Sequence, residues 1–135
     1  MTHKPIHILM ADDDLEDIDL METAITTIEP KANLHKVVNG RAVIDFLDRQ
    51  SDYELPCLII LDYNMPELTG AEVLAVISKE KRYENIPKIV LSTSSTSAYI
   101  NECLSNGATE YFIKPDNMTA LATMAKKLLH YCNVN

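Results

Sequence analysis

Five polar side chains that could perform phosphoryl chemistry stand at the ends of short apolar runs in this sequence. In chain order they are Asp12, Asp13, Asp62, Ser92 and Lys114. Carboxylates held close together raise each other's pKa, and a divalent cation relieves that repulsion. Oxygen ligands without nearby His or Cys favour Mg²⁺, which binds through one or two carboxylates and keeps water molecules that a phosphate can replace.

Together, these groups supply the parts that phosphoryl transfer requires. A carboxylate such as Asp62 can attack phosphorus, while an ammonium group and a divalent cation neutralise the charge on the phosphoryl oxygens. The Ser92 hydroxyl adds a hydrogen-bond donor to the same oxygens. This chemistry requires the five side chains to meet in space, although they are spread over most of the chain.

The elements that would bring them together are strands and helices in alternation. The apolar runs that predict strands are 6–11, 34–38, 57–61, 86–91 and 111–113. Helices are expected at 15–28, at 42–47 after a turn at Asn39 and Gly40, after Gly70, at 96–106, and from 116 or 117 to about 130. This pattern predicts an α/β fold with a parallel sheet, its most apolar strand in the centre and helices on both faces. In doubly wound sheets, ligands bind at the carboxyl ends of the strands.

Length and composition indicate one folded domain over 1–135, with no output domain. The chain has 135 residues, of which 47% are hydrophobic and 24% charged, and a formal net charge of -8. Six of its 20 acidic residues fall between positions 12 and 19, with no basic residue among them. This balance argues against nucleic-acid binding, which needs clustered Lys and Arg. Four of these acids are interpreted as a helix cap and a solvated helix face: Asp14, Glu16, Asp17 and Asp19.

The apolar runs and the cysteines indicate the compartment. No run approaches the roughly 20 residues that span a bilayer, so no membrane association is expected and the protein is expected in the cytoplasm. Cys57, Cys103 and Cys132 lie in apolar stretches without C-x-x-C spacing. We expect them to be buried free thiols.

Four stretches resemble, in order, the receiver domain of response regulators. They are 8–14, 61–66 with Gly70 beyond it, 87–92 and 107–115. The resemblance extends from residue 6 to about 129 and is to single-domain, chemotaxis-regulator-like receivers. It implies a flavodoxin-like (βα)5 three-layer sandwich, with a parallel five-stranded sheet in the order 2-1-3-4-5. The connection 49–56 and the hydroxyl run 93–95 are similar to the branch that serves bacteriophytochrome-type histidine kinases.

The resemblance also implies roles for individual residues. Asp62 would accept a phosphoryl group from a phosphohistidine on a histidine kinase or a histidine phosphotransfer protein. Asp12, Asp13 and Asp62 would hold Mg²⁺ together with the backbone carbonyl of Asn64. Lys114 would pair with the phosphoryl group. The protein would then be a phosphoacceptor with slow autodephosphorylation rather than an enzyme.

The switch that reads this phosphorylation is also implied by the resemblance. Ser92 would move toward the phosphoryl group, with Thr93 as the alternative hydroxyl, and Tyr111 would move inward behind it. The bond between Lys114 and Pro115 would be cis. The signal would reach a downstream protein through the face formed by the last two helices and the strand between them, in a monomer or in a homodimer formed through that face.

Three other functions use parts of the same pattern. A Mg²⁺-dependent phosphohydrolase that forms an aspartyl phosphate usually has a second carboxylate two residues after the nucleophile, where this chain has Asn64. A flavodoxin-like cofactor binder would need a Gly- and hydroxyl-rich loop after the first strand, where three aspartates would repel a phosphate. A receiver-like interaction module that is not phosphorylated would have no need of the acidic pair, Asp62 and Lys114.

Overall fold

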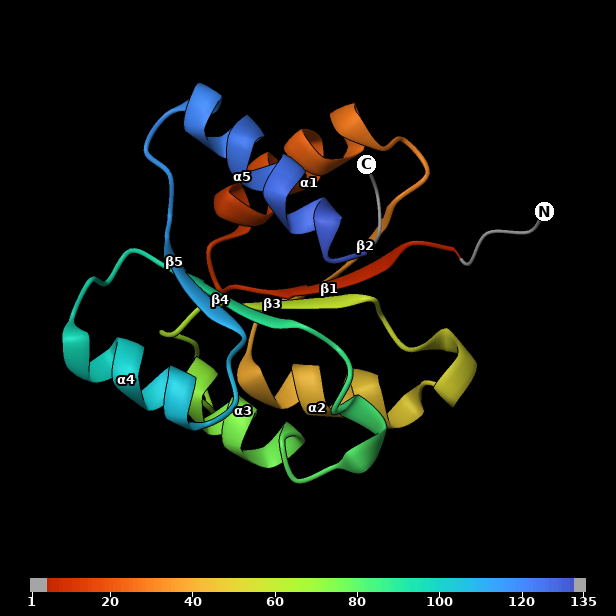
Figure 1. Ribbon diagram of the computed structural model, residues 1–135, viewed down its shortest axis with the longest axis vertical. Coiled ribbons are helices and arrows are strands. Elements are labelled where there is room, and N and C mark those ends of the chain that lie inside the picture. The colour runs from red at the N-terminus through yellow and green to blue at the C-terminus, as the bar shows by residue number, and fades with distance from the viewer. Residues whose placement is uncertain (1–4, 133–135) are drawn as a thin grey trace.

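A parallel sheet forms the middle layer of the protein, as the computed structural model of residues 5–132 shows (Figure 1). Its five strands are β1 (His7–Ala11), β2 (Asn33–Val37), β3 (Leu58–Leu61), β4 (Lys88–Ser92) and β5 (Glu110–Ile113). They lie in the order β2-β1-β3-β4-β5, and every neighbouring pair is parallel. The predicted fold class is therefore confirmed. The ends of the expected domain, 1–4 and 133–135, lie outside the described residues.

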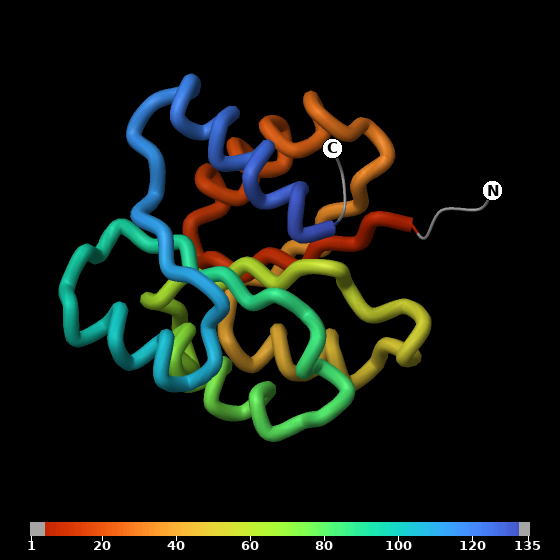
Figure 2. The backbone as a smooth tube through the Cα atoms, in the orientation of Figure 1, coloured from red at the N-terminus to blue at the C-terminus, as the bar shows by residue number. Residues whose placement is uncertain are grey.

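Helices cover both faces of this sheet. They are α1 (Leu15–Ile28), α2 (Gly40–Arg49), α3 (Gly70–Ile77), α4 (Ser97–Ser105) and α5 (Met118–His130). Helices α1 and α5 lie together on one face, and α2, α3 and α4 lie on the other (Figures 1 and 2). None of the helices within residues 5–132 is long and apolar enough to cross a bilayer.

Two apolar cores separate the three layers, and alternation along the central strands builds both. In β1, Leu9 belongs to the core beneath α2 and α3, whereas Ile8 and Met10 belong to the core beneath α1 and α5. All four residues of β3 are fully buried, as expected for a central strand that is covered on both sides. Burial of this apolar surface fixes the strand register and with it the positions of the residues that follow each strand.

Side-chain caps set where several helices begin. Asp14 caps α1 as predicted, because its carboxylate accepts hydrogen bonds from the backbone N–H groups of Glu16 and Asp17. Asn39, which we expected in a turn, is instead the N-cap of α2 and accepts a hydrogen bond of 2.7 Å from the N–H of Ala42. Helix α2 therefore begins at Gly40 rather than at residue 42.

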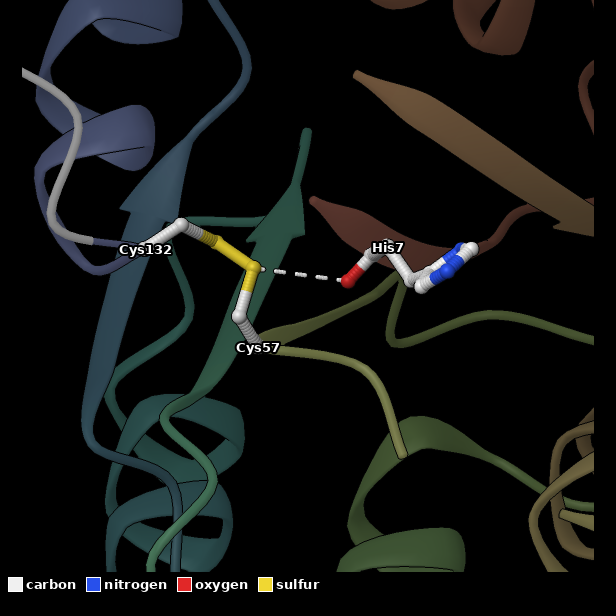
Figure 3. Close-up of a disulfide and its surroundings, with 3 residues drawn as sticks. All are labelled: His7, Cys57 and Cys132. Atoms are coloured by element: carbon white, nitrogen blue, oxygen red, sulfur yellow. Dashed lines mark hydrogen bonds between the residues drawn. A yellow bond between two sulfur atoms is a disulfide. The ribbon is translucent and has the colours of Figure 1, made fainter. Parts of the chain in front are cut away.

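The expectation of three free thiols is wrong for two of them. Cys57, just before β3, and Cys132, just after α5, form a disulfide with a Cα–Cα distance of 5.3 Å (Figure 3). The pair is 75 residues apart in sequence, and it meets because the start of β3 and the end of α5 lie at the same end of the molecule. The sulfur of Cys57 also lies 3.4 Å from the carbonyl oxygen of His7. Cys103 is free and buried, as predicted.

Candidate functional site

The structure gathers the five predicted polar side chains at the carboxyl edge of the sheet. Asp12 directly follows β1 and Asp62 directly follows β3, while Ser92 is the last residue of β4 and Lys114 follows β5. Parallel pairing of β1 with β3 sets the two aspartates side by side, and the N–H of Asp62 donates a 2.9 Å hydrogen bond to the carbonyl of Ala11. The separate strand ends of the sequence thus become one site.

Three carboxylates converge at the centre of this site. Asp12 is 1% exposed and Asp62 is 7% exposed, whereas Asp13 is open to solvent. One carboxylate oxygen from each of the three lies within 4.8 Å of the others. Buried carboxylates so close together are costly unless a positive charge compensates them.

The donor set fits a divalent cation. Asp12 Oδ1 accepts a hydrogen bond of 2.9 Å from the N–H of Asp14, but Asp12 Oδ2 is buried and receives no well-aligned hydrogen bond. That oxygen is only in ion-pair contact with Lys114. Three carboxylates that converge with no His or Cys ligand among them, one of them buried with Lys114 as its cationic partner, suit a hard ion such as Mg²⁺. Asn64, whose backbone carbonyl is the expected fourth ligand, is exposed in the loop after β3.

The ammonium group of Lys114 places a positive charge among the carboxylates of the site. Its Nζ lies 2.7 Å from Asp12 Oδ2, 2.7 Å from Asp17 Oδ2 and 3.7 Å from Asp62 Oδ2. Burial alone would lower the pKa of Lys114, but its contacts with Asp12 and Asp17 and the charge of Asp62 outweigh burial and raise this pKa. The ammonium group therefore stays charged at neutral pH.

The predicted cis bond before Pro115 is wrong. Among residues 5–132 no peptide bond is cis, so Lys114 and Pro115 are joined by a trans bond. The trans form is the more stable isomer of an X-Pro bond, by about 0.5–1 kcal/mol. With this trans bond the Lys114 ammonium group contacts both Asp12 and Asp17, so the cis form is not needed to bring it into the site.

Asp62 has a strongly shifted proton affinity. Burial, followed by the charge of Asp12, raises the pKa of Asp62 from its ordinary value of 3.8 to about 6, although the charge of Lys114 opposes the rise. A carboxylate that stays partly protonated near neutral pH is a weak nucleophile. Positive charge at the site would restore its ionised form.

This shift predicts a pH dependence of stability in the metal-free protein. Between pH 3.8 and about 6, folded Asp62 binds more protons than unfolded Asp62, so its contribution to the free energy of unfolding falls as the pH rises. Above about pH 6 the contribution of Asp62 to the free energy of unfolding no longer changes with pH. Urea denaturation in EDTA, compared between wild type and Asp62→Asn, isolates this contribution. A stability difference that does not change with pH would contradict it, and added Mg²⁺ should stabilise the wild type at pH 7.

The two candidate hydroxyl groups have different environments. Ser92 is fully buried, and its Oγ accepts a hydrogen bond of 3.3 Å from the N–H of Ser94. Thr93 is exposed. A buried hydroxyl at a strand end beside the carboxylates has less freedom to reach other partners than an exposed one. Ser92 is thus enclosed at the carboxyl edge of the sheet, whereas Thr93 faces solvent.

Tyr111 connects β5 with the loop between β4 and α4. Its ring is half-buried, and its hydroxyl donates a hydrogen bond of 2.7 Å to the carbonyl of Ser94. Ser94 is also the residue whose N–H binds Ser92. One loop residue, Ser94, thus contacts both predicted switch side chains.

Two residues at the site were not predicted from the sequence. Asp17, interpreted as part of a solvated helix face, instead pairs with Lys114, 97 residues away. Tyr63 follows Asp62, and its hydroxyl donates a 2.6 Å hydrogen bond to Glu102 in α4. The Tyr63 ring also stacks on Tyr99 of α4, with centroids 4.1 Å apart. These are contacts between distant segments, which local spacing does not reveal.

Comparison with known proteins identifies the family. The family model of the response regulator receiver domain matches residues 8–126, which is most of the chain. This protein belongs to the response regulator receiver domain family. The receiver domain is similar to the two-component response regulator ORR5 of rice (Oryza sativa subsp. japonica), with 27% identity over 91% of this chain and 88% of that protein.

Solved structures of response regulators share this receiver fold. The phosphorylated cyanobacterial phytochrome response regulator RcpA matches with a TM-score of 0.84 and 28% identity, over 96% of this chain and 94% of that one. The Mn²⁺-bound form of the response regulator Rcp1 matches with a TM-score of 0.82 and 30% identity, over 95% and 94%. The receiver domain also has the fold of the chemotaxis regulator CheY4 of Vibrio cholerae, with a TM-score of 0.77 at 22% identity.

Proposed function

We propose that this receiver domain functions in a response regulator, in which Asp62 accepts a phosphoryl group from a phosphohistidine on a histidine kinase or histidine phosphotransfer protein. The observation that carries the proposal is the buried carboxylate of Asp62, close to Asp12 and Asp13 and 3.7 Å from the Lys114 ammonium group. Membership in the receiver family supports the same conclusion. The protein acts as a phosphoacceptor rather than as an enzyme with turnover.

The transfer requires little from the protein beyond position and charge. An oxygen of Asp62 attacks phosphorus, the new O–P bond forms, and the P–N bond to the partner's imidazole breaks. Lys114 and the hydroxyl of Ser92 bind the phosphoryl oxygens. Because the site is largely buried, these charged contacts act more strongly there than they would in water.

The metal ligands in this proposal are Asp12, Asp13, Asp62 and the backbone carbonyl of Asn64. Mg²⁺ bound there would supply positive charge that keeps Asp62 ionised and offsets the charge of the phosphoryl oxygens. The convergence of carboxylate oxygens from Asp12, Asp13 and Asp62 within 4.8 Å of one another supports this assignment.

The signal leaves through the face formed by α4, β5 and α5. Ser92 and Tyr111 change position together when the Ser92 hydroxyl binds the phosphoryl group on Asp62, since both side chains contact Ser94. Exposed apolar side chains on this face support docking of a downstream protein or of a second copy: Leu104, Ile113 and Met118. The net charge of -8 argues against a nucleic-acid target.

The partner kinase in this proposal is of the bacteriophytochrome type. Support comes from the likeness to RcpA, a cyanobacterial phytochrome response regulator, at 28% identity over nearly the whole chain. Phosphotransfer from a panel of purified histidine kinases, compared at short times, identifies the partner. Preferential transfer from a kinase outside the phytochrome group would overturn this part of the proposal.

The proposed function is tested by phosphorylation with small phosphodonors. The protein is incubated with phosphoramidate or acetyl phosphate in Mg²⁺ or in EDTA, and the product is examined by intact-protein mass spectrometry. We expect one phosphoryl group per chain in Mg²⁺ and almost none in EDTA. An unmodified protein in Mg²⁺ would support the alternative of an interaction module, and rapid turnover of a generic phosphomonoester would support the phosphohydrolase.

The choice of switch hydroxyl predicts a difference between two neighbouring substitutions. Ser92→Ala removes a buried donor to the phosphoryl oxygens and should slow phosphorylation by phosphoramidate roughly tenfold, since a hydrogen bond to a charged group contributes about 1.5 kcal/mol or more. Thr93→Ala removes an exposed hydroxyl and should change the rate less than twofold. If labelling over a time course shows that Thr93→Ala slows phosphorylation more than Ser92→Ala does, the role belongs to Thr93.

A further inference from the structure

We infer that Asp17 is a positioning residue that holds Lys114 back from Asp62, so that an incoming phosphoryl group must compete with Asp17 for the Lys114 ammonium group. The inference rests on the proposed function, because it concerns the same site. It adds a residue of α1 that was interpreted from sequence as part of a solvated face. The consequence would be weaker binding of phosphoryl-like anions than the other site residues alone would give.

The geometry of Lys114 carries the inference. Its Nζ donates a hydrogen bond of 2.7 Å to Asp17 Oδ2, whereas Asp62 Oδ2 lies 3.7 Å away, beyond hydrogen-bond distance. The lysine thus lies nearer to the side of α1 than to the carboxylate that would carry the phosphoryl group. Its side chain is only 12% exposed, so water competes weakly for its donors.

The local structure of α1 fixes the position from which Asp17 acts. The cap at Asp14 accepts hydrogen bonds from the N–H groups of Glu16 and Asp17, which orders the first turn of the helix. Ile18, the next residue, is buried against the sheet. The cap before Asp17 and the buried Ile18 after it therefore fix the backbone of Asp17 beside the site.

Charge balance explains why the competition would matter. Asp12 also contacts Lys114 at 2.7 Å, but its oxygens belong to the proposed metal site. Asp17 is outside that set of ligands, so it remains a partner for Lys114 when the metal is bound. The Asp17 side chain is 34% exposed, and ion pairs of that exposure are weak, so releasing Lys114 should change affinity about two- to fivefold.

The first test measures the affinity of beryllofluoride, an analogue of the phosphoryl group, in Mg²⁺ by titration calorimetry. Asp17→Asn is compared with Asp19→Asn, which removes the same charge from an exposed position of the same helix. We expect Asp17→Asn to bind about two to five times more tightly than Asp19→Asn. Asp17→Ala should act in the same direction. Equal or weaker binding by Asp17→Asn would overturn the inference.

A double-mutant cycle separates action through Lys114 from direct repulsion of the anion. Phosphorylation rates with phosphoramidate are measured for the wild type, Asp17→Asn, Lys114→Ala and the double variant. Rates are used here because labelling of the slow Lys114→Ala variants can be followed over long incubations. We expect Asp17→Asn to accelerate the reaction only when Lys114 is present. An undiminished acceleration in the Lys114→Ala background would overturn the inference. Failure of the wild type to be labelled would instead overturn the proposed function.

Discussion

Asp62→Asn should abolish covalent phosphorylation, with a loss of at least about a hundredfold in the labelling rate by small phosphodonors or by a kinase. The amide that replaces the carboxylate has no anionic oxygen to attack phosphorus. The substitution is nearly isosteric, so the fold should be kept. Intact-protein mass spectrometry after incubation in Mg²⁺ measures the effect directly.

A matched control for this substitution is Asp45→Asn in α2. Asp45 is exposed and is not one of the site residues, so its loss of charge should leave labelling unchanged. Asp62→Asn should also make the metal-free protein more stable at pH 7, because it removes a buried carboxylate whose pKa is raised by burial and by Asp12. Labelling of Asp62→Asn at the wild-type rate would show that another residue is the acceptor.

Loss of the disulfide between Cys57 and Cys132 should lower the free energy of unfolding by about 4 kcal/mol. The bond closes a loop with a sequence separation of 75 residues, and a closed loop of that length strongly restricts the unfolded chain. Urea denaturation of the oxidised protein, the reduced protein and the variant with Cys57→Ser and Cys132→Ser measures the difference.

The reducing agent has an internal control in the double Ser variant. That variant has no bond to reduce, so the agent should not shift its midpoint. Cys103, which is free and buried, is present in all three samples. Identical midpoints for the oxidised and reduced wild type would show that the bond contributes no stability in solution.

The strands and helices could be predicted because their patterns are local. The run at 57–61 is apolar at every position, and β3 is fully buried in the centre of the sheet. The cap at Asp14 could be predicted for the same reason. Asn39 was interpreted differently because an Asn-Gly pair suits both a turn and a helix start, and only packing of α2 decides between them.

The site could be predicted as far as topology determines it. Parallel strands must bring their carboxyl ends to one edge, so Asp12, Asp62 and Lys114 had to meet. Asp17 could not be placed in this way, because its contact depends on how α1 lies against the end of β5. The pairing of Cys57 with Cys132 likewise depends on where α5 ends relative to β3.

The stacked tyrosines beside Asp62 give this protein an internal optical reporter. The chain contains no Trp, so its near-ultraviolet circular dichroism comes from six tyrosines, two phenylalanines and the disulfide. Tyr63 and Tyr99 stack almost parallel, at 9°, and such a pair couples its electronic transitions according to its geometry. One ring is attached to the residue after Asp62 and the other to α4. A change in the relative orientation of the phosphoacceptor loop and α4 should therefore change the contribution of this pair to the spectrum, without any added label.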